Sequence, residues 1–402
     1  MPEVKPEIQT IAKIKVIGVG GCGGAAVNRM VAAKVKGVEF IAINTDLQAL
    51  QHNTAPLKLH IGRSTTRGLG AGMNPALGRK AAEESQNEIR EALKGADMIF
   101  LTYGGGGGTG GGAGPKVAEI AQELGALTIA IVTKPFSFEG GPRKRFAEES
   151  INELSARVDT LITIPNDRIW QIIDKKTPLL EAFGLVDEVL RQGVQGISEL
   201  ITLPGLINVD FADVKTIMEK SGSALLGMGE AGSDNRAVEA AKAAIASPLL
   251  ELSIEGAKGI LFTITGGPNM TMYEVSEAAK TITESVDNDA KIIWGAVIDD
   301  SLKDTMKITV VATGFEDAVR GHLRGVSSAV RGASGIFAPP KQAPKPDLPS
   351  KSPFEYKNIK IEENKNDETV KPSSTVLTDI NEPTSADDED IEIPPFIRKK
   401  MM

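Results

Sequence analysis

A glycine-rich run between a strand-like and a helix-like segment restricts the fold more than any other feature. Residues 103–114 read YGGGGGTGGGAG; they follow the apolar residues 98–102 and precede residues 115–120, where we expect a helix to begin. Glycines permit positive φ angles and close approach to an anion, and the amides of a strand–loop–helix junction point toward it. Thr109 adds a hydroxyl in the centre of the run. A flexible linker would not be framed in this way, so the run predicts a phosphate-binding loop.

A second glycine loop lies near the start of the chain. Gly18, Gly20 and Gly23 have the G-x-G-x-x-G spacing, between a strand-like run at 14–17 and a helical pattern. Asp46 ends another apolar run about twenty residues later, so this motif taken alone favours NAD. Two such loops in one α/β unit instead indicate a phosphate chain held from two sides, as in a nucleoside triphosphate. The lysine-bearing P-loop motif is absent.

The composition fits a soluble globular protein of a reducing compartment. The 402 residues are 41% hydrophobic, carry a net charge of −8 and include one cysteine, Cys22. The acidic balance argues against nucleic-acid binding, and one cysteine excludes an internal disulfide. The charged N-terminus lacks the apolar core of a signal peptide, and no run approaches membrane-spanning length. We therefore expect a cytoplasmic protein, in which Cys22 is a small loop residue rather than a nucleophile.

Strand-like and helical patterns alternate through the first half, which predicts an α/β, Rossmann-like domain with a parallel sheet. Thr177, Pro178 and apolar residues at helical spacing predict a long helix after it. Later strand-like runs predict a second, smaller α/β domain. The expected boundaries are 1–12 for an N-terminal extension, 13–176 for the nucleotide-binding domain, 177–204 for the helix and 205–316 for the second domain.

The end of the chain predicts a flexible linker followed by a peptide that binds partner proteins. Residues 317–390 are rich in Pro, Lys, Ser, Asn and Asp and cannot bury enough apolar surface to fold. Residues 391–402 combine apolar side chains with cations. We expect partners to contact Ile393, Pro394, Phe396, Ile397 and Arg398. A frayed terminus with chance hydrophobic residues is the alternative.

Asp210 and Asp213 lie three residues apart at the start of a predicted helix. In the structural interpretation Asp210 is the N-cap and Asp213 is an acid favoured by the helix dipole. In the functional interpretation one or both carboxylates orient a water that attacks a phosphate, or help hold a metal. The two interpretations are compatible.

These features, in this order, resemble the FtsZ family, the bacterial tubulin homologues that hydrolyse GTP and form the cell-division ring. The resemblance covers residues 12–315 and the end of the tail. Its motifs lie at residues 19–24, 44–46, 66–72, 106–110, 134–140, 165–167, 192–197, 208–213 and 393–398.

The resemblance implies a site for GTP or GDP with Mg²⁺. It places the phosphates between two loops, formed by Gly21, Cys22, Gly23, Gly24 and Ala25 and by Gly108, Thr109 and Gly110. Glu139 and Arg143 would lie near the ribose and phosphates, and Asn166, Phe183 and Asp187 would bind guanine. Without the resemblance, Phe183 is interpreted as part of an apolar helix face and Glu139 with Arg143 as a surface ion pair.

The resemblance also implies a head-to-tail homopolymer in which Asp210 and Asp213 complete the site of the next subunit. Such a contact does not close, so it generates filaments. The three cations after Ile397 are too few for stable membrane binding, so adaptor proteins at mid-cell are the expected partners of the tail. The alternatives are an NAD-dependent oxidoreductase and a GTP-binding scaffold that does not hydrolyse GTP.

The chain departs from the family pattern within both glycine loops. The family usually has Asn at Ala25, a second Thr at Gly111, Met at Gly105 and Ala at both Tyr103 and Gly114. Extra glycines cost conformational entropy on ordering, and Ala25 lacks a side-chain amide. We therefore expect weaker nucleotide affinity or slower turnover.

Overall fold

The structure is a computed structural model that describes residues 12–315, apart from 172, 174–175, 203–204, 208, 233 and 248–252. The predicted linker at 317–390 and the tail peptide at 391–402 lie outside these residues. No helix of the described part is both long and apolar enough to cross a membrane.

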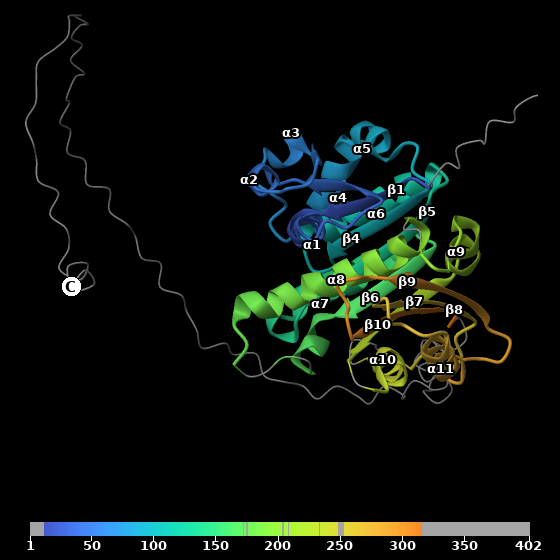
Figure 1. The fold of residues 1–402 in the computed structure, drawn as a ribbon. Helices are drawn as coiled ribbons and strands as arrows, with labels where there is room; N and C mark the ends of the chain where they lie inside the picture. Colours follow the sequence, from blue (N-terminus) through green and yellow to red (C-terminus); the bar gives the residue numbers. More distant parts are fainter. Residues whose placement is uncertain are drawn as a thin grey trace, which may run out of the picture. The chain divides into compact units, whose positions relative to one another are not determined.

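The first half of the described chain is a parallel sheet with helices on both faces (Figure 1). Its strands, all paired in parallel in the order β3-β2-β1-β4-β5-β6, are β1 (Ile14–Val19), β2 (Val38–Asn44), β3 (Leu57–His60), β4 (Met98–Gly104), β5 (Leu127–Lys134) and β6 (Thr160–Pro165). Its helices are α1 (Gly20–Ala32), α2 (Leu47–Gln51), α3 (Arg63–Thr66), α4 (Pro75–Glu84), α5 (Gln86–Leu93), α6 (Gly108–Glu123) and α7 (Gly141–Ser155). Two 3₁₀ helices follow β5 and β6, η1 (Ser137–Glu139) and η2 (Asn166–Gln171).

Two helices cross from this half to the rest of the sheet: α8 (Leu179–Thr202), within the range predicted for the central helix, and α9 (Phe211–Met218). The sheet continues through β7 (Gly222–Ala231), β10 (Met306–Thr313), β8 (Gly259–Gly266) and β9 (Lys291–Ile298), so all ten strands form one sheet. β7 joins β6 in parallel, and β10 is antiparallel to both β7 and β8. The helices α10 (Arg236–Ile245) and α11 (Met272–Thr283) cover this half. The predicted domains therefore share a continuous sheet, and their boundaries stay predictions.

Both faces of the first half are buried, which explains its nearly continuous apolar strands. In β1, Ile14 and Val16 pack in a core with α1, α8 and α9, whereas Ile17 and Val19 pack on the other face with α4, α5 and α6. A third core lies between β8, β10 and the helices α10 and α11. The predicted α/β fold with a mainly parallel sheet is confirmed.

The glycine run at 103–114 differs from its prediction, because only residues 105–107 lie between the strand and the helix. β4 extends to Gly104 and α6 begins at Gly108, so Pro115 lies inside the helix and does not open it. A Cβ atom at Gly112 would lie 2.0 Å from the Pro75 carbonyl oxygen, and one at Gly108 would lie 2.7 Å from the Asn74 nitrogen. Glycine at these two positions therefore allows close packing of α6 against the start of α4.

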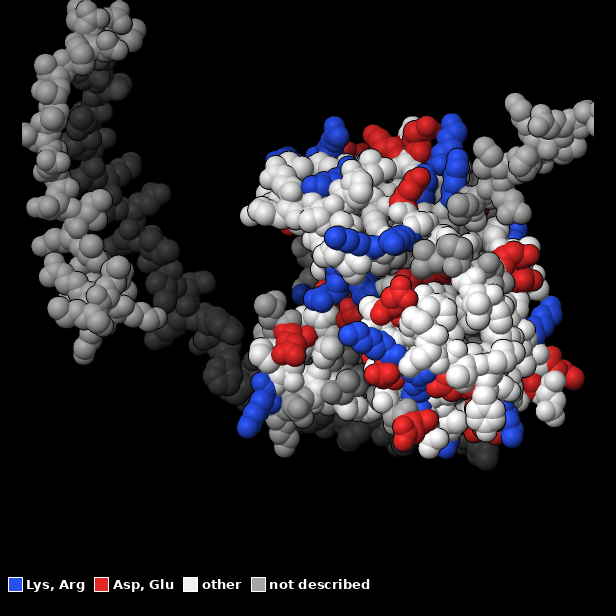
Figure 2. Space-filling view, viewed as in Figure 1, with Lys and Arg blue, Asp and Glu red and all other residues white. Residues whose placement is uncertain are grey.

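Charged side chains are interspersed on the face drawn in Figure 2, where neither sign forms one large continuous patch over the described residues. The net charge of −8 therefore does not appear on this face as one acidic patch.

Candidate functional site

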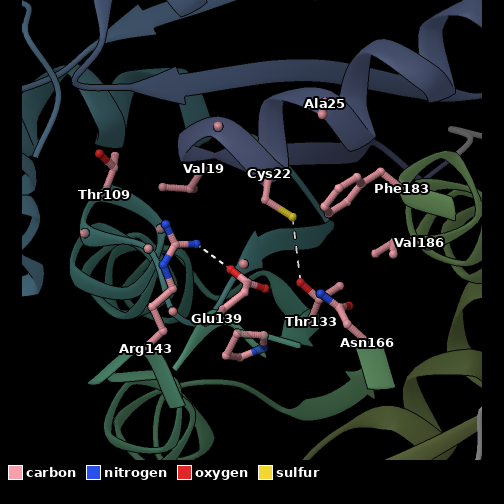
Figure 3. A pocket seen from close by; sticks show the side chains of 18 of the residues that line it. Val19, Cys22, Ala25, Thr109, Thr133, Glu139, Arg143, Asn166, Phe183 and Val186 are labelled. Atoms are coloured by element: carbon pink, nitrogen blue, oxygen red, sulfur yellow. Dashed lines mark hydrogen bonds and ion pairs between the residues drawn. The ribbon is translucent and has the colours of Figure 1, made fainter. Parts of the chain in front are cut away.

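A cavity of about 520 Å³ opens at the carboxyl ends of β1, β4 and β5. The N-terminal turn of α1 forms one wall, the segment 104–110 between β4 and α6 another, and α8 the wall at its far end (Figure 3). Ligands of open parallel sheets bind at this edge. The fold thus brings both predicted glycine loops to one cavity.

Most residues predicted to bind the nucleotide line this cavity. They are Gly21, Cys22, Ala25, Gly108, Thr109, Gly110, Glu139, Arg143, Asn166, Phe183 and Asp187. Gly23 and Gly24 do not line it. A Cβ atom at Gly23 would lie 2.4 Å from the Thr102 carbonyl oxygen, so this glycine allows α1 to pack on β4. Gly24 lines a smaller neighbouring cavity of about 140 Å³.

One end of the cavity suits an anion. α1 begins at Gly20 and α6 at Gly108, so two helix N-termini meet there. Their unpaired N–H groups and helix dipoles favour negative charge. Thr109 and Arg143 lie at this end, and Arg143 forms an ion pair with Glu139 (Figure 3). Hydrogen-bond donors and the positive ends of two helix dipoles therefore lie at this end of the cavity, while the charge of Arg143 is offset by Glu139.

The other end offers an aromatic ring and hydrogen-bond acceptors. Phe183 is 45% exposed although it is apolar, and it makes an edge contact with Phe136 at 5.8 Å between ring centroids. The Asn166 Oδ1 atom is buried without a hydrogen-bond partner in the described structure. Since buried polar atoms are normally paired, Asn166 is suited to a ligand that donates hydrogen bonds. Figure 3 shows Phe183, Val186 and Asn166 together, across the cavity from Thr109.

Asp187 adds a carboxylate from α8 to the same end. Burial raises the pKa of Asp187 to about 6, and the Arg29 guanidinium partly offsets this effect, with Nε at 3.9 Å from Oδ2. The predicted interpretation of Phe183 as a purely apolar helix face is therefore incomplete, because its ring shares a cavity with two polar acceptors.

Cys22 is a neutral thiol in this cavity. Burial raises the pKa of Cys22 to about 11, although a hydrogen bond with Thr133, at 3.7 Å between Sγ and Oγ1, acts in the opposite direction. A thiol with this pKa stays protonated at neutral pH and is a poor nucleophile. This agrees with the prediction that Cys22 is not a nucleophile, but the predicted loop position is wrong, because Cys22 lies in the first turn of α1.

Several lining residues were not predicted: Val19, Ala71, Gly72, Gly104, Gly105, Gly106, Gly107, Thr133, Pro135 and Val186. Most of them flank a predicted residue or belong to a recognised motif. Ala71 and Gly72 are distant in sequence, but a Cβ atom at Gly108 would lie 3.1 Å from the Ala71 Cβ atom. The family motif at 66–72, which contains both residues, was the sequence feature that could have predicted their place in the cavity.

Asp210 and Asp213 do not line the cavity of their own chain. Both are exposed at the start of α9, where the Asp210 carboxylate accepts a hydrogen bond from the Asp213 backbone N–H at 2.7 Å. The prediction that Asp210 is an N-cap is confirmed. Both residues are exposed to solvent in the single chain.

The chain is similar to a solved structure of an FtsZ dimer from M. jannaschii, with 46% sequence identity and a TM-score of 0.74. The alignment covers 76% of this chain and 89% of the FtsZ chain. The chain belongs to the tubulin/FtsZ family. Its residues 13–174 match the GTPase domain of the tubulin/FtsZ family, and residues 222–316 match the C-terminal domain of the FtsZ family. The chain is also similar to a GDP-bound CetZ1 monomer from Haloferax volcanii, with 22% identity and a TM-score of 0.68. That alignment covers 79% of this chain and 99% of the CetZ1 chain, which shows a shared fold.

Membership of the tubulin/FtsZ family makes this chain an FtsZ-like cytoskeletal GTPase and a guanine-nucleotide binder. The predicted resemblance to FtsZ is confirmed by these matches. The GTPase-domain match selects this activity over the NAD-dependent alternative.

Proposed function

We propose that the cavity binds GTP, that hydrolysis is completed by Asp210 and Asp213 of the next subunit, and that the resulting head-to-tail filaments form the cell-division ring. One observation carries this proposal. Of the two acids that line the cavity, Glu139 is paired with Arg143 and Asp187 with Arg29, so neither is available to activate water at the phosphate end. The acids at the start of α9 are exposed and outside it.

The acceptors at the far end of the cavity favour guanine over adenine. Guanine presents N–H donors at N1 and at its 2-amino group, which a carboxylate can accept as a pair. Asp187 and Asn166 supply the acceptors, and the exposed face of Phe183 supplies a stacking surface. Adenine would leave one of the buried acceptors unpaired, which costs about 1–3 kcal/mol.

The phosphates would lie between Gly21–Cys22 of α1 and Gly108, Thr109 and Gly110 of α6, with Arg143 beside them. The described residues contain no cluster of three or more potential metal-ligand side chains. Mg²⁺ is usually held by phosphate oxygens and waters with few protein ligands, so the cavity fits Mg²⁺ that enters with GTP. When bound, Mg²⁺ neutralises charge that develops on the phosphates.

In this mechanism the protein mainly positions and polarises the reactants, as is general for phosphoryl transfer. Asp210 and Asp213 of the next subunit orient a water toward the γ-phosphorus and accept its hydrogen bonds. The new P–O bond forms as the bond to the β–γ bridging oxygen breaks, and GDP and phosphate leave. Loss of the γ-phosphate then weakens the contact between subunits, so hydrolysis drives polymer turnover.

Self-association is supported by the FtsZ dimer from M. jannaschii that this chain resembles. In the proposal, Ile393, Pro394, Phe396, Ile397 and Arg398 bind adaptor proteins that attach filaments to the membrane at mid-cell. These tail residues lie outside the described structure.

The test is phosphate release and sedimentation with Mg²⁺ and GTP or GDP, measured over a range of protein concentrations. We expect pelleting with GTP and a rate per molecule that rises above a threshold concentration. Hydrolysis that is proportional to concentration, without a pellet, would show that one chain holds a complete site. Pelleting without phosphate release would support the non-hydrolysing scaffold instead.

A further inference from the structure

We propose that Thr45 is a positioning residue that aims the hydroxyl proton of Thr109 into the cavity, toward a phosphate of the bound nucleotide. The inference rests on the proposed function and deepens it. Thr45 follows β2 and does not line the cavity, whereas Thr109 does. Their Oγ1 atoms are 2.6 Å apart, which is a short hydrogen bond between two hydroxyls.

The direction of this hydrogen bond follows from burial. Thr45 is completely buried, and the Thr109 oxygen is the one hydrogen-bond partner of its hydroxyl among the described residues. If Thr109 donated to Thr45, the Thr45 proton would have no acceptor, and a buried unpaired donor is strongly unfavourable. Thr45 therefore donates and Thr109 accepts. The Thr109 proton is then left free on the side of the cavity.

The backbone around Thr45 is held by several donors. Its carbonyl oxygen accepts from the Gly70 N–H at 3.4 Å and lies 3.3 Å from the His60 Nε2 atom. It also lies 3.3 Å from the Thr66 hydroxyl, whose one proton is shared with the Gly62 carbonyl oxygen at 3.0 Å. Asp46, the next residue, caps α2 through the Ala49 N–H. Thr45 thus has little freedom to move, and it holds the Thr109 side chain in one rotamer.

This arrangement matters because Thr109 is the second residue of α6, at the anion-binding end of the cavity. Figure 3 shows Thr109 on the side opposite to Phe183 and Asn166, so it would meet the phosphates and not the base. A hydroxyl that accepts one hydrogen bond is a better donor in a second, because hydrogen bonds in a chain polarise one another. Thr45 therefore strengthens a phosphate contact that it does not itself make.

The test measures the affinity for a slowly hydrolysed GTP analogue below the polymerisation threshold. Thr45→Ala is expected to weaken it about tenfold, while Thr45→Ser, which keeps the hydroxyl, restores most of it. Guanosine, which has no phosphate, is expected to bind the wild type and Thr45→Ala equally in a competition assay. Thr128→Ala serves as control, because its buried hydroxyl donates to the Ala126 carbonyl oxygen at 3.0 Å, outside the cavity lining.

A double-mutant cycle decides whether Thr45 acts through Thr109. We expect Thr45→Ala to have no further effect in a Thr109→Ala background. Additive effects, or equal losses for guanosine and the GTP analogue, would overturn the inference while leaving the proposed function in place. Unchanged affinity in a folded Thr45→Ala chain would overturn it as well. A wild-type chain that binds no guanine nucleotide would instead contradict the proposed function.

Discussion

In the proposed function, Asp187 is the residue whose protonation state depends most directly on whether guanine is bound. Burial raises its pKa to about 6 in the nucleotide-free chain, so the carboxyl is substantially protonated in mildly acidic solution. Hydrogen bonds donated to a carboxylate favour its ionised form. A guanine that donates two N–H groups therefore binds the ionised form and must displace the proton at low pH.

We predict opposite pH dependences for affinity and stability. Below pH 6 the affinity for GTP should fall about tenfold per pH unit, because one proton must leave. The raised pKa means that protonation stabilises the folded, nucleotide-free chain, so the Asp187 contribution to stability is present at low pH and is lost as pH rises through about 6. Titration calorimetry and denaturant unfolding between pH 4.5 and pH 7.5 measure both, with Asp187→Asn as the control. Affinity of the wild type that stays flat below pH 6 would contradict the assignment.

Two departures from the family pattern, Tyr103 and Gly114, form one packing unit. The Tyr103 ring is completely buried, and a Cβ atom at Gly114 would lie 2.4 Å from the ring carbon Cε1. The phenol group pairs with the Ser150 hydroxyl of α7 at 2.9 Å. Gly114 thus makes room for Tyr103 inside the core. We expected the extra glycines to weaken nucleotide binding through the entropy cost of ordering a loop. Gly114 gives no support to this expectation, because it lies in a helix and outside the cavity lining.

We predict that Gly114→Ala destabilises the chain by about 1–3 kcal/mol, because it overpacks the Tyr103 ring. Tyr103→Ala alone leaves a cavity and should cost about 3–5 kcal/mol. The double variant Tyr103→Ala/Gly114→Ala should be more stable than the sum of the two single effects indicates. Denaturant unfolding of the four chains measures this coupling. Additive effects would show that the two positions are independent.

At the scale of elements, α9 shows how one residue has both a structural and a proposed catalytic role. Asp210 caps the helix through the Asp213 N–H, and both carboxylates face solvent. The two roles are separable, because asparagine caps a helix about as well as aspartate but has no charge.

We predict that Asp210→Asn keeps the stability of the chain within about 0.5 kcal/mol, whereas Asp210→Ala lowers it by about 1 kcal/mol. Both should reduce GTP hydrolysis to a similar extent, because both remove the carboxylate that acts on the neighbouring subunit. Thermal unfolding and phosphate release are the measurements. Full hydrolysis by Asp210→Asn would mean that this residue is a cap alone.

At the scale of the whole molecule, the proposed active site is divided between the cavity and the exposed start of α9. Neighbouring subunits in a filament then contribute different parts of each site. Two inactive variants with defects in different parts of the site should therefore restore GTP hydrolysis when they are mixed.

We predict that a mixture of Asp187→Ala, with a defective cavity, and Asp213→Asn, with a defective acid, hydrolyses GTP faster than either chain alone. Random assembly of equal amounts places an intact cavity against intact acids at about a quarter of the contacts. Mixing Asp210→Asn with Asp213→Asn is the control, since both are defective in the same segment. A mixture no faster than its components would show that sites do not form between subunits.

The sequence alone determined the features that depend on residues close together in the chain, namely strands, helices and helix caps. Buried parallel strands require apolar runs, so the runs at 14–17 and 98–102 predicted β1 and β4 close to their observed positions. Thr177 and Pro178 with helical spacing placed α8, and the position of Asp210 predicted its cap. The edge strand β3 was missed because it is short and exposes Leu57, and β7 because glycines interrupt its pattern.

The tertiary structure decided which residues meet. Glycines look alike in sequence, whether they hold an anion, as expected of Gly108, or allow contact with another helix, as Gly112 does with Pro75. The pairing of Tyr103 with Gly114 and of Thr45 with Thr109 depends on distances between elements, which no local pattern encodes. Sequence spacing determines the local backbone, but a binding site is made where distant segments converge, and that convergence is a property of the packed sheet and its helices.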